Sequence, residues 1–371
     1  MEKNNVKQIH DFGQSIWLDF IDRQIMESGD LQKLIDEDGV RGVTSNPAIF
    51  EKAISSSSDY DEDIKELSQQ DLSNEDLFYR LAVSDIKRAA DLFKPVYEEE
   101  VKGADGYISL EVSPHLARDT QGTIKQAQQL WKAVDRENVM IKIPGTAEGL
   151  PAIRQCISEG ININVTLLFS LDRYEAVAEA YIAGLEDRLN AGQPIDQIAS
   201  VASFFLSRID VMIDPILKEK GLQQLQGQVA IASAKKAYEI YKKVFSSERF
   251  KKLEAKGAKP QRLLWASTSS KNPDFRDTKY VEALIGPNTV NTIPMDTLEA
   301  FRDHGQAENT LEKDMDQATH TLEELRKAGV SLDDVTNKLE EEGIAKFNQP
   351  YDKLLKAIEE QKNKAEASSK S

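Results

Sequence analysis

The feature that most constrains the fold of this chain is an alternation of strand-like and helix-like segments along most of its 371 residues. Each strand-like segment is short and is followed by a segment with the apolar spacing of a helix. We predict strands over residues 15–20, 40–46, 106–112, 138–143, 161–169, 198–204, 262–267 and 288–293. Eight strands that alternate with helices favour an α/β fold, the (β/α)8 or TIM barrel.

No linker divides the chain, so we expect one barrel domain over residues 1–371. Residues from about 296 to 360 should form a C-terminal helical extension packed on the barrel, and the polar residues 361–371 should fray. We also predict one long charged helix over residues 226–254. A doubly wound open sheet is the alternative architecture. It is disfavoured because neither a dinucleotide-binding Gly-x-Gly-x-x-Gly nor a Walker-type phosphate loop is present.

Composition narrows the choice of partners and of cellular location. The net charge of −16 argues against nucleic acid as a partner, and an anionic metabolite would need a local cluster of basic groups. The single cysteine, Cys156, fits a small buried helical side chain and a reducing compartment. The N-terminus lacks a signal-peptide core and no apolar run is long enough for a membrane. We therefore expect a cytoplasmic protein without a membrane span.

Lys142 is the residue that most directly indicates chemistry. It lies inside the fourth predicted strand, between Ile141 and Ile143, where its ammonium group must be paired or lose its hydration. One interpretation is a structural lysine that a carboxylate neutralises. The other is a lysine kept partly neutral by the apolar barrel interior, so that its amine attacks a ketone and forms a Schiff base. Spacing alone leaves both open.

The carboxyl ends of the predicted strands carry many polar side chains. Active-site groups of a barrel come from these ends. The polar residues there are Asp19, Asn46, Glu111, Lys142, Asn164, Thr166, Ser203 and Ser267. In the fifth strand Asn162, Asn164 and Thr166 alternate with apolar residues, so we expect them to point into the barrel. They could bind a hydroxylated ligand, or they could bond to one another or to water.

Two carboxylates could serve imine chemistry at Lys142. Forming and cleaving an imine requires a proton shuttle, and cleaving the adjacent carbon chain requires a base for a hydroxyl proton. Asp19 and Glu111 could divide these tasks. Each alone is equally consistent with a lysine partner or a helix cap.

Basic residues after two strand ends are candidates for anion binding. Arg208 and Lys271 each follow a strand end near a predicted helix start, and Ser267 could donate a further hydrogen bond. The alternative for Arg208 is a surface salt bridge with Asp210 or Asp214.

Four motifs together resemble the transaldolase family. They are Gly-Val-Thr-Ser-Asn-Pro-Ala-Ile-Phe at 42–50, Ile-Lys-Ile-Pro-Gly-Thr at 141–146, Asn-Val-Thr-Leu-Leu-Phe-Ser at 164–170 and Trp-Ala-Ser-Thr-Ser-Ser-Lys at 265–271. They occur in the family's order, within a match from about residue 15 to 294. The resemblance implies a (β/α)8 relative of class I aldolases. The longer C-terminal end resembles the longer bacterial branch.

The resemblance also implies roles for individual residues. Lys142 matches the Schiff-base lysine, Asp19 the acid/base for carbon–carbon cleavage, and Glu111 the carboxylate that activates water with help from Thr166. The implied substrate contacts are Asn46 and Asn164 for the dihydroxyacetone part, and Ser203, Phe205 and Arg208 for the rest of the substrate and its phosphate. Shorter members carry an arginine as the second phosphate ligand, where this chain offers the point charge of Lys271.

From these observations we expect a transferase that moves a dihydroxyacetone unit between sugar phosphates in the pentose phosphate pathway, without a metal or organic cofactor. The four histidines show no metal-ligand spacing. One alternative is a fructose-6-phosphate aldolase, although that group is much shorter. The other is a non-catalytic barrel that only binds sugar phosphates. The sequence leaves the oligomeric state open, a homodimer included.

Overall fold

The computed structural model describes residues 4–99 and 101–369 and confirms the predicted (β/α)8 barrel. Its strands close in chain order into one barrel, and every neighbouring pair is parallel. The strands are β1 Gln14–Asp19, β2 Gly42–Thr44, β3 Tyr107–Glu111, β4 Val139–Pro144, β5 Ile163–Leu168, β6 Ser200–Phe205, β7 Arg262–Ala266 and β8 Thr289–Ile293. Each lies within a residue or two of a predicted segment, except that β2 is shorter.

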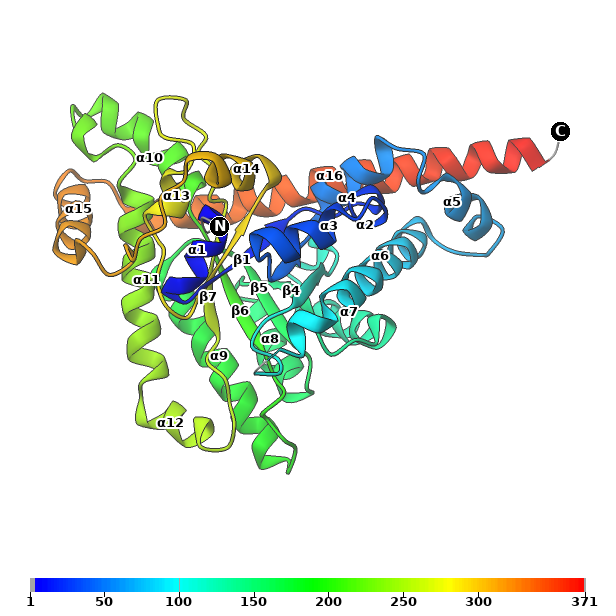
Figure 1. The fold of residues 1–371 in the computed structure, drawn as a ribbon, viewed down its shortest axis with the longest axis horizontal. Coiled ribbons are helices and arrows are strands. Elements are labelled where there is room, and N and C mark those ends of the chain that lie inside the picture. The colour runs from blue at the N-terminus through cyan, green and yellow to red at the C-terminus, as the bar shows by residue number, and fades with distance from the viewer. Residues whose placement is uncertain (1–3, 100, 370–371) are drawn as a thin grey trace.

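Helices surround the barrel (Figure 1). They are α1 Asn5–Gln8, α2 Arg23–Glu27, α3 Asp30–Lys33, α4 Pro47–Ser55, α5 Asp61–Leu67, α6 Asn74–Tyr97, α7 Thr120–Val134, α8 Gly149–Ser158, α9 Leu171–Asn190, α10 Ser207–Glu219, α11 Val229–Phe245, α12 Glu248–Glu254, α13 Lys279–Glu282, α14 Met295–His304, α15 Met315–Lys327 and α16 Leu332–Ser369. Single turns occur at η1 Ile9–Phe12, η2 Leu34–Asp38, η3 Pro114–Leu116 and η4 Gln223–Leu225. Among the described residues, no helix is both long and apolar enough to cross a membrane.

The prediction of one helix over residues 226–254 is wrong, because two separate helices, α11 and α12, occupy this segment. The hydroxyl of Ser247 accepts a hydrogen bond from the backbone N–H of Phe250 at 3.2 Å, which caps the start of α12. A serine at such a position satisfies a free N–H group of the new helix. Charge and apolar spacing continue through the break, so the periodicity did not reveal it.

Bulky side chains fill the amino-terminal end of the barrel. Trp17 of β1 is fully buried, and its indole N–H donates to Asp105 at 2.7 Å. The ring lies so close to β2 that a side chain at Gly42 would meet it at 2.7 Å. Only glycine fits there.

The C-terminal helix α16 crosses one end of the barrel (Figure 1). It packs against α4, α6 and α10 and contacts β5. Glu340 of α16 accepts from the guanidinium of Arg173 at 2.8 Å, and Arg173 also donates to the backbone oxygen of Gly145 at 2.9 Å. Helix α16 runs as far as Ser369 and includes most of the segment that we expect to fray, and residues 370–371 lie outside the described part of the chain.

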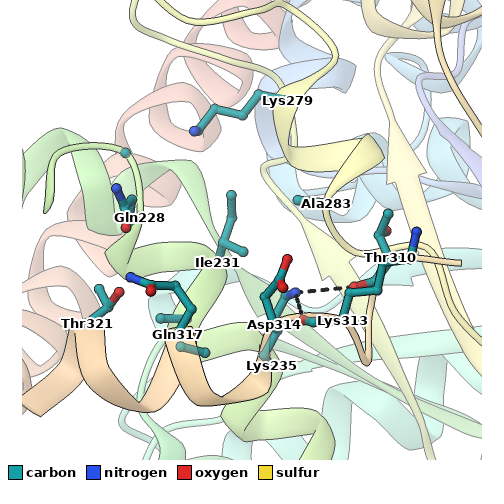
Figure 2. Close-up of a pocket in the computed structure, with 13 residues that line it drawn as sticks. Gln228, Ile231, Lys235, Lys279, Ala283, Thr310, Lys313, Asp314, Gln317 and Thr321 are labelled. Carbon is teal, nitrogen blue, oxygen red and sulfur yellow. Dashed lines mark hydrogen bonds between the residues drawn. The ribbon is translucent and has the colours of Figure 1, made fainter. Parts of the chain in front are cut away.

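A buried lysine attaches the loop before α15 to α11. Figure 2 shows the pocket of about 290 Å³ between α11, α13 and α15. The ammonium of Lys235 on α11 donates to the backbone oxygen of Thr310 at 3.2 Å and to that of Lys313. These hydrogen bonds pair the Lys235 ammonium with backbone oxygens of the protein itself, so we assign the residue a structural role.

Candidate active site

Strand register places the key polar residues at one level of the barrel. Glu111 of β3 lies beside Lys142 of β4, and Lys142 lies beside Asn164 of β5. On the next pair of strands Asp19 of β1 lies beside Thr44 of β2. Because paired residues of parallel strands point to the same face, these side chains converge on the barrel interior near its carboxyl end.

Lys142 is buried, and its ammonium has few partners. Its Nζ atom donates to the backbone oxygen of Ser45 at 3.0 Å and lies 3.6 Å from Oε2 of Glu111. At this distance the ammonium and the carboxylate form an ion pair, but they are too far apart for a hydrogen bond. The amine therefore has only one strong acceptor within the described structure, which suits a group that must react.

Glu111 is a buried carboxyl group with unusual electrostatics. Neither carboxyl oxygen accepts a hydrogen bond from the part of the chain that the structure describes. Burial raises the pKa of Glu111 to about 7, with a smaller contribution from Asp19, while the charge of Lys142 opposes the shift. A carboxyl group that titrates near neutral pH can both accept and return a proton.

Asp19 lies at the end of β1, where two threonines surround it. Thr44 donates to Oδ1 of Asp19 at 2.8 Å, and the hydroxyls of Thr44 and Thr292 are 2.5 Å apart. Burial raises the pKa of Asp19, while Lys142, the Thr44 hydrogen bond and Lys271 act in the opposite direction. The site thus holds two carboxyl groups with raised pKa values around one lysine.

The inward polar residues of β5 differ in how they are bonded. Asn164 donates to the hydroxyl of Ser109 at 3.0 Å and accepts from that of Ser203 at 2.7 Å, so for this side chain the alternative of internal bonding holds. Asn162 bonds to backbone groups, including the N–H of Ala199. The buried hydroxyl of Thr166 has no hydrogen-bond partner among the described residues. Of these three residues, Thr166 is therefore the one that lines the cavity with a hydroxyl that makes no hydrogen bond within the described chain.

A cavity of about 240 Å³ opens at this end of the barrel. The predicted site residues that line it are Asp19, Asn46, Lys142, Thr166, Ser203, Phe205, Arg208, Ser267 and Lys271. Glu111 and Asn164 do not line it, although each contacts a residue that does. The Oδ1 atom of Asn46 caps α4 by accepting from the N–H of Ile49 at 3.0 Å, so the group it can offer the cavity is its amide NH2.

The basic residues gather at one side of the cavity. The surface salt bridge considered for Arg208 is wrong, because Asp210 accepts from Tyr280 at 2.6 Å and Asp214 accepts from the N–H of Gly227 at 3.0 Å. Atom Nη1 of Arg208 is enclosed without a partner in the described chain. Lys271 is exposed at the rim and donates to Ser269 at 2.7 Å.

Backbone strain marks two strand ends beside the cavity. Ser267 has a φ of 55° and Leu167 has a φ of 58°, values that favour glycine. The Ser267 hydroxyl is 2.7 Å from that of Ser207, which starts α10. Non-glycine residues in this region cost of order 1–3 kcal/mol each and cluster at functional sites.

Sequence reasoning missed several lining residues, among them Thr44, Thr292, Pro294 and Phe347. Thr44 lies within a quoted motif, and Thr292 and Pro294 lie at the end of the eighth predicted strand, so strand-end polarity could have found the threonines. Phe347 lies far beyond the last strand, on α16, and no local signal indicates it. Within the described residues no group of three or more His, Cys, Asp or Glu side chains could hold a metal ion.

The fold and the cavity are those of a (β/α)8-barrel enzyme with its polar groups at the carboxyl ends of the strands. Comparison with known proteins identifies the family. The profile described as Transaldolase/Fructose-6-phosphate aldolase matches residues 16–358. The chain belongs to this family.

Relatives of similar length carry the name transaldolase. One from Trichodesmium erythraeum is 50% identical, with 98% of this chain and 99% of the relative covered. Another from Saccharopolyspora erythraea is 48% identical, with 98% and 99% coverage. A third from Thiobacillus denitrificans is 45% identical, with 96% and 99% coverage. The C-terminal extension therefore falls within the length that these relatives share with the chain.

Proposed function

We propose that the protein is a transaldolase, a transferase that moves a dihydroxyacetone unit from a ketose phosphate to an aldose phosphate. The observation that carries this proposal is the buried Lys142, which lies 3.6 Å from the Glu111 carboxyl in a cavity also lined by Asp19. The full-length similarity to proteins named transaldolase supports it. The donor would be sedoheptulose 7-phosphate or fructose 6-phosphate, in the non-oxidative pentose phosphate pathway.

The first half of the reaction would form and use an imine. The neutral amine of Lys142 attacks the ketone carbon of the donor, and loss of water gives an iminium ion. Asp19 removes the proton of the C4 hydroxyl, the C3–C4 bond breaks, and its electrons pass to the iminium. An aldose phosphate leaves, and a three-carbon enamine stays bound to Lys142. The iminium is the electron sink, so the step requires no metal.

The second half would reverse these events on a new acceptor. The enamine carbon attacks the aldehyde of glyceraldehyde 3-phosphate or erythrose 4-phosphate, and Asp19 returns its proton to the new hydroxyl. Water then attacks the iminium and releases the product. Glu111 would accept a proton from that water. The hydroxyl of Thr166, which has no hydrogen-bond partner in the described chain, would assist Glu111 in this step. A carboxyl group whose pKa is about 7 suits this role at neutral pH.

Basic groups at one side of the cavity would select the phosphate of each substrate. The Arg208 guanidinium has an enclosed donor without a protein partner, and Lys271 lies at the rim. An anion held there would satisfy the enclosed donor of Arg208 through charge-assisted hydrogen bonds. Asn46 and Ser203, which line the cavity, would hold the hydroxyl groups of the dihydroxyacetone unit, and Asn164 would act through its hydrogen bond with Ser203.

Borohydride trapping tests the central step. Wild-type protein incubated with fructose 6-phosphate and sodium borohydride should gain the mass of the reduced dihydroxyacetone or hexose phosphate adduct, and peptide mapping should locate it on Lys142. Lys142→Ala should gain no mass. Lys235→Met is the matched control, since it also removes a buried lysine but should still be labelled. The proposal fails if wild type is not labelled, or if Lys142→Ala is labelled equally.

Two alternative functions predict different experimental outcomes. A fructose-6-phosphate aldolase would release free dihydroxyacetone rapidly when no acceptor aldose is present, whereas a transaldolase would release it slowly and transfer it once erythrose 4-phosphate is added. A barrel that only binds sugar phosphates would be stabilised thermally by them without forming any adduct.

We also propose that residues 1–371 form one domain, with α14 to α16 as an extension packed on the barrel. We place the enzyme in the cytoplasm, in keeping with its one free, buried cysteine, Cys156. Light scattering coupled to size exclusion would distinguish a monomer from the homodimer that the sequence leaves open.

A further inference from the structure

Arg208 is half-buried and has unused hydrogen-bonding capacity. It is the second residue of α10, and its guanidinium lines the cavity. Its Nη1 atom is enclosed and has no hydrogen-bond partner in the described residues. An arginine side chain is flexible, and an unpaired one would normally turn towards water. Another kind of contact must therefore keep this guanidinium in the cavity.

Two phenylalanine rings supply that contact. The Arg208 Cζ atom lies 5.4 Å from the ring centroid of Phe205 and 5.9 Å from that of Phe347. Both distances fall within the range of about 6 Å for cation–π attraction. Phe205 ends β6 and packs against Phe169, with 5.3 Å between ring centroids, so one side of the pair belongs to the barrel itself. Phe347 comes from α16 and also lines the cavity.

A structural arginine in the same chain is held differently. The Arg23 guanidinium lies 4.1 Å from the ring centroid of Tyr60, but it also pairs with Asp85 at 3.0 Å and Asp63 at 2.7 Å. Its donors are therefore consumed by protein carboxylates. Aromatic rings without nearby carboxylates orient Arg208 and leave its donors for an anion.

The position of Phe347 is fixed by the packing of α16. A side chain at Gly343, one turn earlier, would meet Leu167 at 2.9 Å, so the helix lies against the end of β5. The Glu340–Arg173 ion pair at 2.8 Å holds the preceding turn. Farther along, the ring of Tyr351 packs edge-on against Phe78, with 6.0 Å between centroids. These contacts lie on either side of Phe347, whose buried ring lines the cavity.

We propose that Phe347 is a positioning residue for substrate phosphate: with Phe205 it holds the Arg208 guanidinium towards the cavity, so that the C-terminal helix helps to select phosphorylated sugars. The inference rests on the proposed function, because it concerns the phosphate end of the same cavity. It gives the C-terminal extension a part in substrate binding, through one aromatic ring and without any contact with the reacting carbons.

Steady-state kinetics and phosphate binding test the inference. We expect Phe347→Leu to raise KM for fructose 6-phosphate about tenfold, the order of effect of one lost cation–π contact, with kcat within about twofold of wild type. The inhibition constant of inorganic phosphate should rise by a similar factor. Phe347→Tyr keeps the ring and should behave like wild type within about twofold. Borohydride trapping at saturating donor should still label Lys142 in every variant.

A matched control separates positioning from a general loosening of α16. Leu354→Ala removes a fully buried side chain from the same helix, two turns beyond Phe347 and outside the cavity. It should lower thermal stability while leaving both KM and the phosphate inhibition constant near the wild-type values. The inference is overturned if Phe347→Leu leaves both constants unchanged, if Phe347→Tyr is as impaired as Phe347→Leu, or if Leu354→Ala raises both constants equally.

The failure of this inference is distinguishable from that of the proposed function. If wild type forms the Lys142 adduct but the constants do not respond to Phe347→Leu, only the inference fails. Thermal stabilisation by inorganic phosphate adds a readout that does not depend on turnover, and it should be weaker in Phe347→Leu than in Leu354→Ala relative to each unliganded variant. Equal stabilisation of the two variants would count against the role of Phe347.

Discussion

At the scale of single residues, the site is notable for polar groups that the fold leaves incompletely bonded. Glu111, Thr166 and Arg208 each bury an atom that has no hydrogen-bond partner in the described chain. Such groups lower the stability of a fold unless a ligand or water satisfies them. Thr166 and Arg208 line the cavity that also holds Lys142, and Glu111 lies beside Lys142, so these groups lead to two predictions about the site.

The pH dependence of the reaction should follow Glu111. Its pKa of about 7 means that the group is protonated, and unable to accept a proton, at lower pH. We therefore expect kcat/KM for the acceptor erythrose 4-phosphate, whose half-reaction ends with the water attack, to fall as the pH drops below about 7, approaching tenfold per pH unit, and to level off above it. Glu111→Gln should be slower and should lose this part of the profile. An unchanged acid limb in that variant would assign the titration to another group.

Replacement of Thr166 by valine should separate activity from stability. The change removes a buried, unpartnered hydroxyl while keeping the shape, so the free energy of unfolding should stay within about 1 kcal/mol of wild type. Activity should fall by about ten- to a hundredfold if the hydroxyl assists water attack. Thr123→Val is the control: it removes a buried hydroxyl bonded to Leu116 at 3.0 Å and should cost about 1 kcal/mol without affecting turnover. Normal turnover in Thr166→Val would exclude the assisting role.

At the scale of elements, short capping and anchoring contacts decide where helices end and how they attach. Ser247 separates α11 from α12, although the apolar pattern continues through both. Lys235 ties the loop before α15 to α11 through two backbone oxygens (Figure 2). Neither contact touches the cavity, so both should act on stability alone.

Loss of the Lys235 ammonium should destabilise the C-terminal part of the fold. Lys235→Met keeps most of the aliphatic stem but leaves the carbonyl groups of Thr310 and Lys313 without their donor. We expect a loss of about 1–3 kcal/mol in the free energy of unfolding, measured by chemical denaturation, and unchanged kcat and KM. The half-buried Lys236, which pairs with Glu239 of the same helix, provides the contrast: Lys236→Met should change stability by less than about 1 kcal/mol. Equal effects of the two substitutions would argue against an anchoring role.

At the scale of the whole molecule, the C-terminal extension packs directly against the helices and one strand of the barrel. Helix α16 packs against α4, α5 and α6 from the early part of the chain and against α10 from its middle. The cavity takes its wall from β-strand ends and from Phe347 of α16. Unfolding of α16 alone would therefore expose apolar surface of the barrel helices and disrupt the cavity.

Calorimetry should record one cooperative unfolding transition for the whole chain, if the extension and the barrel form a single domain. The calorimetric enthalpy should equal the van't Hoff enthalpy, and Leu354→Ala should shift the whole transition to lower temperature. An early, separate transition that responds alone to Leu354→Ala would show that α16 unfolds independently.

The sequence by itself determined the barrel, the place of Lys142 and the polar strand ends. Alternating periodicity and family motifs are local signals, which the sequence alone carries. Only the tertiary structure decided which polar groups are satisfied: Asn164 finds Ser203, while Thr166 and Arg208 find no partner among the described residues. It also decided that Phe347 reaches the cavity. Contacts between residues far apart in the chain depend on how whole helices pack, and no local pattern encodes them.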